Sequence, residues 1–106
     1  MKLWIDDLRP APAGYIWVKT VNDAKWYIES AEDVEEIFPT GTPVIKLIDI
    51  DHDAGDFASN GGDYIKLLDW LEETGRNYPI RLHSMNPVGV QNMRTIINKN
   101  GWKEVF

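Results

Sequence analysis

The chain has 106 residues, which is enough for one domain with one hydrophobic core and leaves no room for a second. It contains no cysteine, so disulfides, thiolate zinc sites and cysteine nucleophiles are excluded. Seventeen acidic residues against eleven basic ones give a formal net charge of −6, which argues against a broad surface for binding the backbone of nucleic acids.

The N-terminal segment does not have the pattern of a secretion signal, because Asp6 and Asp7 follow only five residues. No apolar run approaches the length that is needed to cross a bilayer. We therefore expect a cytoplasmic protein that does not bind a membrane, with residues 1–106 forming a single domain.

Two short strands and a loop are predicted first. Residues 3–5 alternate in the manner of a strand, and residues 16–18 are rich in residues that favour β structure. Residues 8–14 between them carry two prolines and a glycine, so they are predicted to form a loop. This link is too short for an ordinary crossover helix, which makes the pairing of these two strands the weakest part of the predicted topology.

After Thr20, which is a candidate N-cap, the apolar residues Val21, Ala24 and Ile28 recur at helical spacing and predict a helix. Ser30 followed by Asp33 resembles a capping box and predicts a second short helix through Phe38. The residues of that second helix predicted to face inward are Val34, Ile37 and Phe38.

Three further strands are predicted in the second half of the chain. Residues 44–50 are almost continuously apolar, as in a central parallel strand that is covered on both faces. Residues 51–60 form a polar loop, residues 80–84 a fourth strand, and residues 102–106 a final strand.

Two amphipathic helices separate these strands. The first has an apolar stripe and ends at Gly75, and the second begins with Asn86 as N-cap and Pro87 at the first helical position and ends at Gly101. Their inward positions are Tyr64, Leu67, Leu68 and Leu71, then Val90, Met93 and Ile97. Strands that alternate with helices predict a three-layer α/β sandwich with a largely parallel five-stranded sheet, in which the first crossover helix is reduced or absent.

Polar side chains gather at the predicted carboxyl ends of three strands. In parallel α/β sheets, ligands bind at this edge, where loops and helix N-termini meet. The residues at the three strand ends are Asp6, Asp7 and Arg9, then Asp49, Asp51, His52 and Asp53, then His83, Ser84 and Asn86.

Carboxylates that are crowded at one edge repel one another, and a divalent cation relieves that repulsion. Asp6, Asp7 and Asp51 are predicted to bind Mg²⁺ or Mn²⁺, or to orient neighbouring groups, because these ions prefer oxygen ligands. The alternative is that Asp6, Asp7 and Asp53 only cap strand ends and turns.

His52 and His83 are predicted to act as general acid and general base in an order that the sequence does not assign, with Asp7 and Asp51 assisting. The alternative is that the histidines make structural hydrogen bonds. Arg9, Ser84 and the helix N-terminus after Asn86 are predicted to hold phosphate oxygens. Arg9 pairing with an aspartate, and Asn86 serving only as a cap, remain open.

The same residues resemble a known family, the cyclic-phosphate-processing receiver-like domains (cREC). The resemblance runs over nearly the whole chain in the family's order and spacing. It rests on Asp6-Asp7-Leu8-Arg9-Pro10, Ile50-Asp51-His52-Asp53, Gly62 before a helix, and His83-Ser84-Met85-Asn86-Pro87 with Gly89.

The resemblance implies a receiver-like, flavodoxin-like fold whose acidic pocket corresponds to Asp6, Asp7 and Asp51. It also implies processing of cyclic phosphate ends on nucleotides or RNA, with His52, His83 and Ser84 as the additions that distinguish the family from signalling receivers. Two departures are visible. Asp49 stands where a small hydroxyl residue is more usual, and Lys103 is followed by Glu104 in place of the receiver's Lys-Pro step.

The function predicted from the sequence is therefore hydrolysis or processing of a cyclic phosphate on a nucleotide or RNA end by a possible phosphoesterase. The alternative is a non-catalytic receiver-like module that binds a protein or a nucleotide, and one or two of the five tryptophans are candidates for exposed contact residues. Signalling through phosphorylation of Asp51 is a third interpretation, which the missing lysine disfavours.

Overall fold

A computed structural model describes all 106 residues, and its five strands form one sheet. The sheet order is β2-β1-β3-β4-β5, and every neighbouring pair is parallel, which confirms the predicted parallel sheet. The strands are β1 (Lys2–Ile5), β2 (Tyr15–Val18), β3 (Leu47–Ile50), β4 (Ile80–Leu82) and β5 (Glu104–Val105). The first pairing is complete, because all four residues of β1 are in register with β2.

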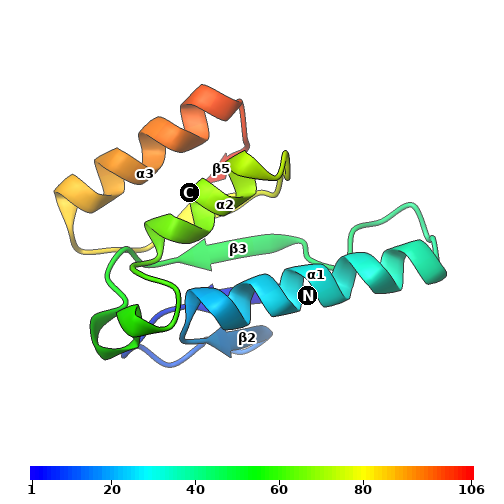
Figure 1. Cartoon of the computed structure of the whole chain (residues 1–106), viewed down its shortest axis with the longest axis horizontal. Helices are drawn as coiled ribbons and strands as arrows, with labels where there is room; N and C mark the ends of the chain where they lie inside the picture. The colour runs from blue at the N-terminus through cyan, green and yellow to red at the C-terminus, as the bar shows by residue number, and fades with distance from the viewer.

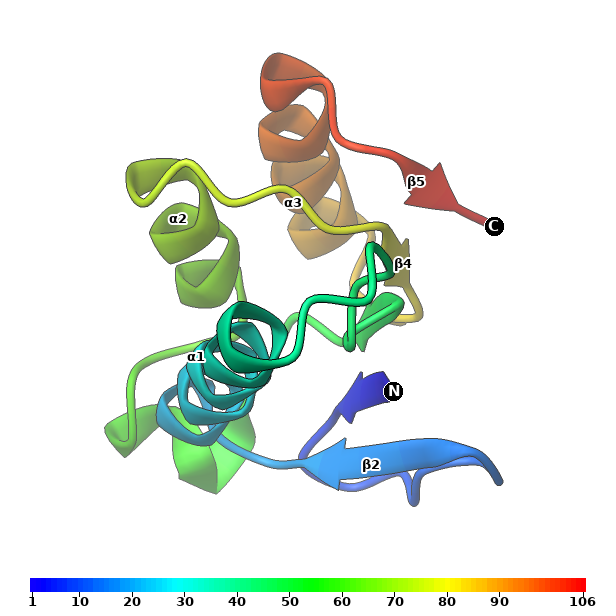
Figure 2. The same cartoon turned by 90° about the vertical axis from the view of Figure 1, so that its right-hand side faces the viewer.

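Three helices pack on the same face of this sheet (Figures 1 and 2). They are α1 (Val21–Ile37), α2 (Ile65–Glu73) and α3 (Pro87–Asn100), and a short 3-10 helix, η1 (Gly55–Ser59), precedes α2. The crossovers from β2 to β3, β3 to β4 and β4 to β5 all run in one direction along the sheet, so right-handed connections place their helices on one side. None of these helices is long and apolar enough to cross a membrane.

The opposite face of the sheet carries no helix. The connection from β1 to β2 runs the other way along the sheet and contains no helix, as predicted from its prolines. The third layer expected of a sandwich is therefore not helical, and side chains such as Trp4 and Tyr15 cover this face of the sheet instead.

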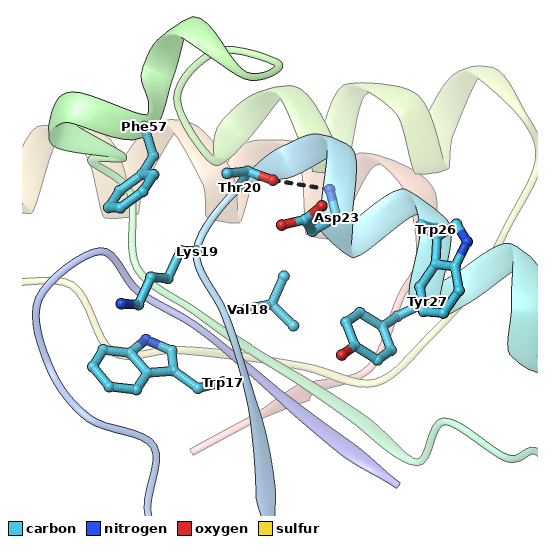
Figure 3. A pocket seen from close by; sticks show the side chains of 8 residues that line it. All are labelled: Trp17, Val18, Lys19, Thr20, Asp23, Trp26, Tyr27 and Phe57. Carbon is cyan, nitrogen blue, oxygen red and sulfur yellow. Dashed lines mark hydrogen bonds between the residues drawn. The ribbon is translucent and has the colours of Figure 1, made fainter.

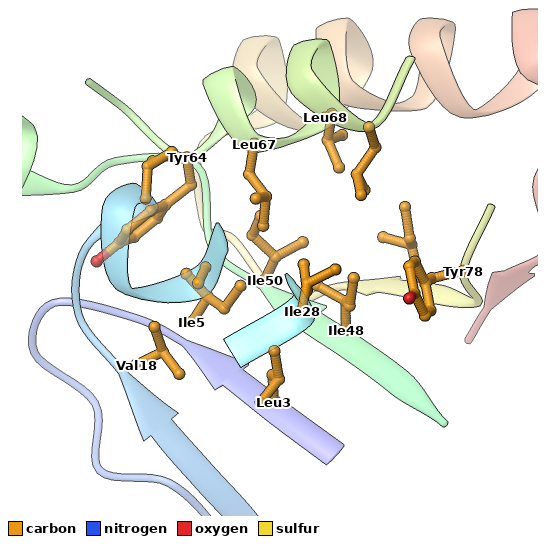
Figure 4. Close-up of a cluster of buried hydrophobic side chains, with 14 of the residues drawn as sticks. Leu3, Ile5, Val18, Ile28, Ile48, Ile50, Tyr64, Leu67, Leu68 and Tyr78 are labelled. Atoms are coloured by element: carbon orange, nitrogen blue, oxygen red, sulfur yellow. The ribbon is translucent and has the colours of Figure 1, made fainter. Parts of the chain in front are cut away.

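The hydrophobic core lies between the helices and the sheet (Figure 4). Alternation along the strands sends Leu3, Ile5 and Ile50 into it, and the predicted stripe of α2 meets them from the other side. The predicted core residues Tyr64, Leu67, Leu68, Leu71, Met93 and Ile97 are all fully buried.

The prediction of two helices before residue 39 is wrong, because α1 is one continuous helix. Thr20 caps it as predicted, accepting a hydrogen bond from the Asp23 N–H, but Ser30 lies inside the helix. The buried stripe of the first half continues through Ala31, which leaves no reason for a break. The last turns extend past the sheet (Figure 1), so Val34, Ile37 and Phe38 are exposed where they were predicted to face inward.

Three strands are shorter than predicted. The fourth strand along the chain, β4, ends at Leu82, whereas it was predicted to reach residue 84. β3 pairs only from Leu47 onward, although Ile45 before it is buried. β5 is limited to Glu104 and Val105, at the edge of the sheet.

Candidate functional site

Carboxylates from two neighbouring strands meet at the carboxyl end of the sheet. Asp6 and Asp7 follow β1, Asp51 follows β3, and Ile5 is in register with Ile50. One oxygen from each of the three carboxylates lies within 4.8 Å of the others. The structure therefore brings together the residues that were predicted as metal ligands.

A cavity of about 370 Å³ opens beside this cluster. It receives residues from the loops after β1, β3 and β4, which are neighbours in the sheet. The predicted site residues that line it are Asp7, Arg9, Asp51, Ser84 and Asn86, and they are joined by Asp53, Leu8 and Met85.

Asp6 is buried, and both of its carboxylate oxygens have hydrogen-bond partners. Its Oδ1 accepts hydrogen bonds from the backbone N–H groups of Leu8 and Arg9, at 2.9 and 2.8 Å, and its Oδ2 lies 2.9 Å from Nε2 of His83. Burial raises the pKa of Asp6, but these hydrogen bonds outweigh burial, so the pKa lies below its ordinary value of 3.8. Asp6 thus caps the turn after β1, as the alternative interpretation expected, while it also borders the acidic cluster.

Asp7 reaches the cavity and has a different electrostatic environment. Burial raises its pKa, and the negative charges of Asp6, Asp51 and Asp53 raise it further. The backbone of Gly55 packs against this carboxylate so closely that a Cβ built on Gly55 would collide with Oδ2 of Asp7. The charge repulsion expected from the sequence is therefore present at Asp7.

The ring of His83 is buried between two carboxylates and an indole. Its Nδ1 lies 2.6 Å from Oδ1 of Asp49, opposite the contact of Nε2 with Asp6, and its side chain is 6% exposed. The ring stacks on Trp4 with centroids 3.8 Å apart and an interplanar angle of 5°. Both ring nitrogens can donate together only in the imidazolium form. This ring does not line the cavity, and both of its nitrogens already contact carboxylates.

Asp49 is the partner that the predicted site did not include. It is fully buried in β3, where it also accepts hydrogen bonds from Tyr15 and from Arg81, both at 3.1 Å. The signal was available, because a carboxylate inside a central apolar strand needs buried partners. With Trp4 and Arg81 beside it in register, Asp49 joins Asp6 and His83 in one network on the helix-free face.

His52 occupies a separate position, between the loop after β3 and the first turn of α3. Its Nδ1 lies 2.8 Å from Oδ1 of Asp53, and its backbone N–H donates to Asp51. A Cβ built on Gly89 would collide with the imidazole ring, so only glycine allows this approach. The hydrogen bond with His52 is the main cause that lowers the pKa of Asp53, which lines the cavity. The ring of His52 does not itself line the cavity and reaches it only through this contact with Asp53.

The predicted phosphate-binding groups lie along the same cavity. The guanidinium of Arg9 donates to the carbonyl of His83 at 3.0 Å and does not pair with an aspartate. Ser84 accepts a hydrogen bond from the N–H of Asn86, whose own Oδ1 caps α3 by accepting from the N–H of Gly89. The predicted cap at Asn86 with Pro87 at the first turn is thus confirmed.

A comparison with protein families gave a match to the model described as "Cyclic-phosphate processing Receiver domain" over residues 1–99. The chain belongs to this family. The resemblance predicted from the motifs is confirmed, and so is the receiver-like fold. Searches of curated proteins and of solved structures gave no match.

This cyclic-phosphate-processing receiver domain lacks a lysine at the carboxyl end of its last strand. Lys103 precedes β5, and its carbonyl accepts a hydrogen bond from the N–H of Ile80 at the start of β4. The residue thus lies at the end of the sheet away from Asp51, as its sequence position suggested.

The network around His83 predicts a loss of stability in acid. Burial raises the pKa of Asp49, but hydrogen bonds from His83 and Arg81 outweigh burial and leave the pKa below 3.8, as they do for Asp6. Carboxylates with a lowered folded pKa stabilise the domain above their unfolded pKa, and this contribution is lost as the pH falls through the folded value. In urea titrations, we expect an unfolding midpoint that is constant from about pH 7 to 5 and falls below about pH 4.

Asp49→Asn provides the comparison for this titration. The variant should have a lower midpoint at neutral pH and a weaker dependence on pH in acid, because one of the shifted carboxylates is gone. An equal acid dependence in the variant and the native protein would show that Asp49 does not contribute to it.

Proposed function

We propose that this receiver domain hydrolyses or otherwise processes a cyclic phosphate on a nucleotide or on an RNA end, within the cavity at the carboxyl end of its sheet. The observation that carries the proposal is the composition of that cavity. Carboxylates and the proposed phosphate-binding residues Arg9, Ser84 and Asn86 line a single space, in a chain whose family is described by cyclic-phosphate processing.

The phosphate would bind between Arg9, Ser84 and the first turn of α3. Arg9 is exposed on the rim, where its guanidinium has further donors beyond the one that is used by the carbonyl of His83. Asn86, the N-cap of α3, lines the same cavity, and the positive end of the helix dipole favours an anion there. These are the positively polarised groups that border the cavity of a chain with net charge −6.

Asp7 and Asp51, with Asp6 beside them, would hold Mg²⁺ or Mn²⁺. The fit is chemical, because all the ligand atoms are oxygens that lie within 4.8 Å of one another. Burial and the neighbouring carboxylates raise the pKa of Asp7, and a bound cation would oppose both effects. When bound, such an ion would stabilise charge on the phosphate oxygens.

His52 is the proposed proton-transfer residue. Water adds to phosphorus, the bond from phosphorus to one ribose oxygen breaks, and that oxygen takes a proton, which leaves a phosphomonoester. Asp53 holds Nδ1 of His52 and so leaves Nε2 for the proton. His83 is proposed to position Asp6 and Asp49, a change from the two-histidine mechanism that the sequence suggested.

The direct test is turnover of 2′,3′-cyclic nucleotides and of RNA with a cyclic phosphate end, with and without Mg²⁺ or Mn²⁺. We expect a phosphomonoester product, loss of turnover with a chelator, and a decrease of about 10²–10³-fold in kcat for Asp51→Asn. Asp56→Asn is the matched control, since Asp56 is exposed in η1 and does not line the cavity.

Thermal unfolding should be measured in parallel, because a ligand of the native state raises the melting temperature. A higher melting temperature without turnover would indicate a nucleotide-binding module in place of an enzyme. The absence of both turnover and shift across the panel would contradict the proposed function.

A further inference from the structure

A second cavity, of about 490 Å³, lies between the edge strand β2 and the first turns of α1. Figure 3 shows Phe57 and Trp17 with Lys19 at one end and Trp26 with Tyr27 at the other, and Val18 between them. We call this cavity the aromatic groove. Its volume is within the range of small-molecule sites, about 300–1,000 Å³.

The two tryptophans of the groove are not part of the hydrophobic core, although Tyr27 and Phe57 pack against it. The buried stripe of α1 is made of Val21, Ala24 and Ile28, whereas Trp26 is 62% exposed. Trp17 is 36% exposed on the edge strand. Exposure of an indole to water is unfavourable because most of its surface is apolar, and its flat face can stack on a planar ligand.

The charged residues of the groove favour a neutral ligand with polar edges. Lys19 lies over Trp17, with Nζ 4.4 Å from the ring centroid, and 5.9 Å from the centroid of Phe57. Asp23 lines the other side at the start of α1, so a cation and an anion face the same space. A second phosphate gains little from such a balanced pair, whereas a nucleobase can stack on the rings and bond to both charges.

The groove and the acidic cavity have a common wall. The indole N–H of Trp17 donates to the backbone carbonyl of Asp6 at 2.8 Å. On the other side, the segment that begins at Asp53 passes Gly55, which packs against Asp7, and reaches Phe57 in η1. The two cavities therefore lie on either side of the backbone at Asp6, and Trp17 is the groove residue that contacts this backbone.

We propose that the aromatic groove binds a nucleobase of the substrate, and that Trp26 is a specificity-determining residue for nucleotides over cyclic phosphates that lack a base. This inference rests on the proposed function for the position of the phosphate. It adds a recognition site that lies outside the acidic cavity.

The test compares Trp26→Ala with the native domain on two substrates, a 2′,3′-cyclic nucleotide and a base-free cyclic phosphate such as glycerol 1,2-cyclic phosphate. We expect kcat/KM for the nucleotide to fall about tenfold, the effect of losing one stacked base, with no change for the base-free substrate. Ile37→Ala is the matched control, because Ile37 is also exposed on α1 but lies three turns beyond Trp26.

Binding of a nucleoside monophosphate, followed by tryptophan fluorescence, separates this inference from the proposed function. If the native domain turns over neither substrate but binds the nucleotide in a Trp26-dependent manner, the proposed function is wrong, whereas binding of a nucleobase in the aromatic groove is supported. Equal turnover or equal binding by Trp26→Ala and the native domain would overturn the inference, as would the absence of any nucleotide binding.

Discussion

His83→Ala is expected to lower the free energy of unfolding by about 3–5 kcal/mol, the usual loss when one partner is removed from a buried ion pair. The ring bridges Asp6 and Asp49, which are 1% and 0% exposed, so the substitution leaves two buried carboxylates without their shared donor. It also removes the ring that stacks on Trp4. Urea unfolding followed by circular dichroism measures the loss, which is large for a domain with a typical stability of about 5–15 kcal/mol.

The other histidine provides the control for this measurement. His52→Ala breaks a pair with Asp53, whose side chain is 58% exposed, so we expect a loss of only about 1 kcal/mol. If His83→Ala unfolds at the native urea concentration and yet has no activity, His83 acts in catalysis and the structural role is wrong.

The second large effect is expected in activity. On the proposed function, His52→Ala should lower kcat by about 10²–10⁴-fold, the usual contribution of a positioned acid or base. The reason is local, since Nδ1 is held by Asp53 at 2.8 Å and the ring is fixed against Gly89. The measurement is kcat for cyclic nucleotide hydrolysis by the variant and by the native domain at the same pH.

Asp53→Asn is the companion variant, and it should show a smaller loss of kcat, because the ring remains and only its anionic partner is gone. Val88→Ala serves as the control on α3, where Val88 is 71% exposed beside Gly89. If the kcat of His52→Ala stayed within a few fold of the native value, His52 would not be the proton-transfer residue.

Local patterns predicted most of the fold. The stripe of α2 and the Asn86 cap of α3 appear in the structure as the spacing indicated, because each depends on neighbours within a few residues. The continuous α1 was missed because Ser30 and Asp33 have the composition of a cap, whereas packing of Ala31 against the sheet decides that the helix continues. The helix-free face followed from the short first crossover, but its consequence for the number of layers depended on strand order.

The location of the site was predicted more reliably than the role of each residue in it. The rule that parallel strands present their carboxyl ends at one edge brought Asp7, Asp51 and Ser84 to one cavity. It did not separate the two histidines, because the direction of a side chain after a strand end depends on the turn that follows. His83 directly follows β4, and its ring contacts Asp6 and Asp49 instead of lining the cavity.

The bridge that His83 makes between β1 and β3 also bears on the order in which the domain assembles. β2, β1 and β3 with α1 come from the first 50 residues, so a three-stranded intermediate can form as the chain emerges from the ribosome. In that intermediate Asp49 faces solvent or an unfilled space, because its imidazole and guanidinium donors are on and beside β4. Docking of β4 then brings the donors of His83 and Arg81 to Asp49 and the ring of His83 to Asp6, so the polar network at the acidic edge is complete only once β4 is in place.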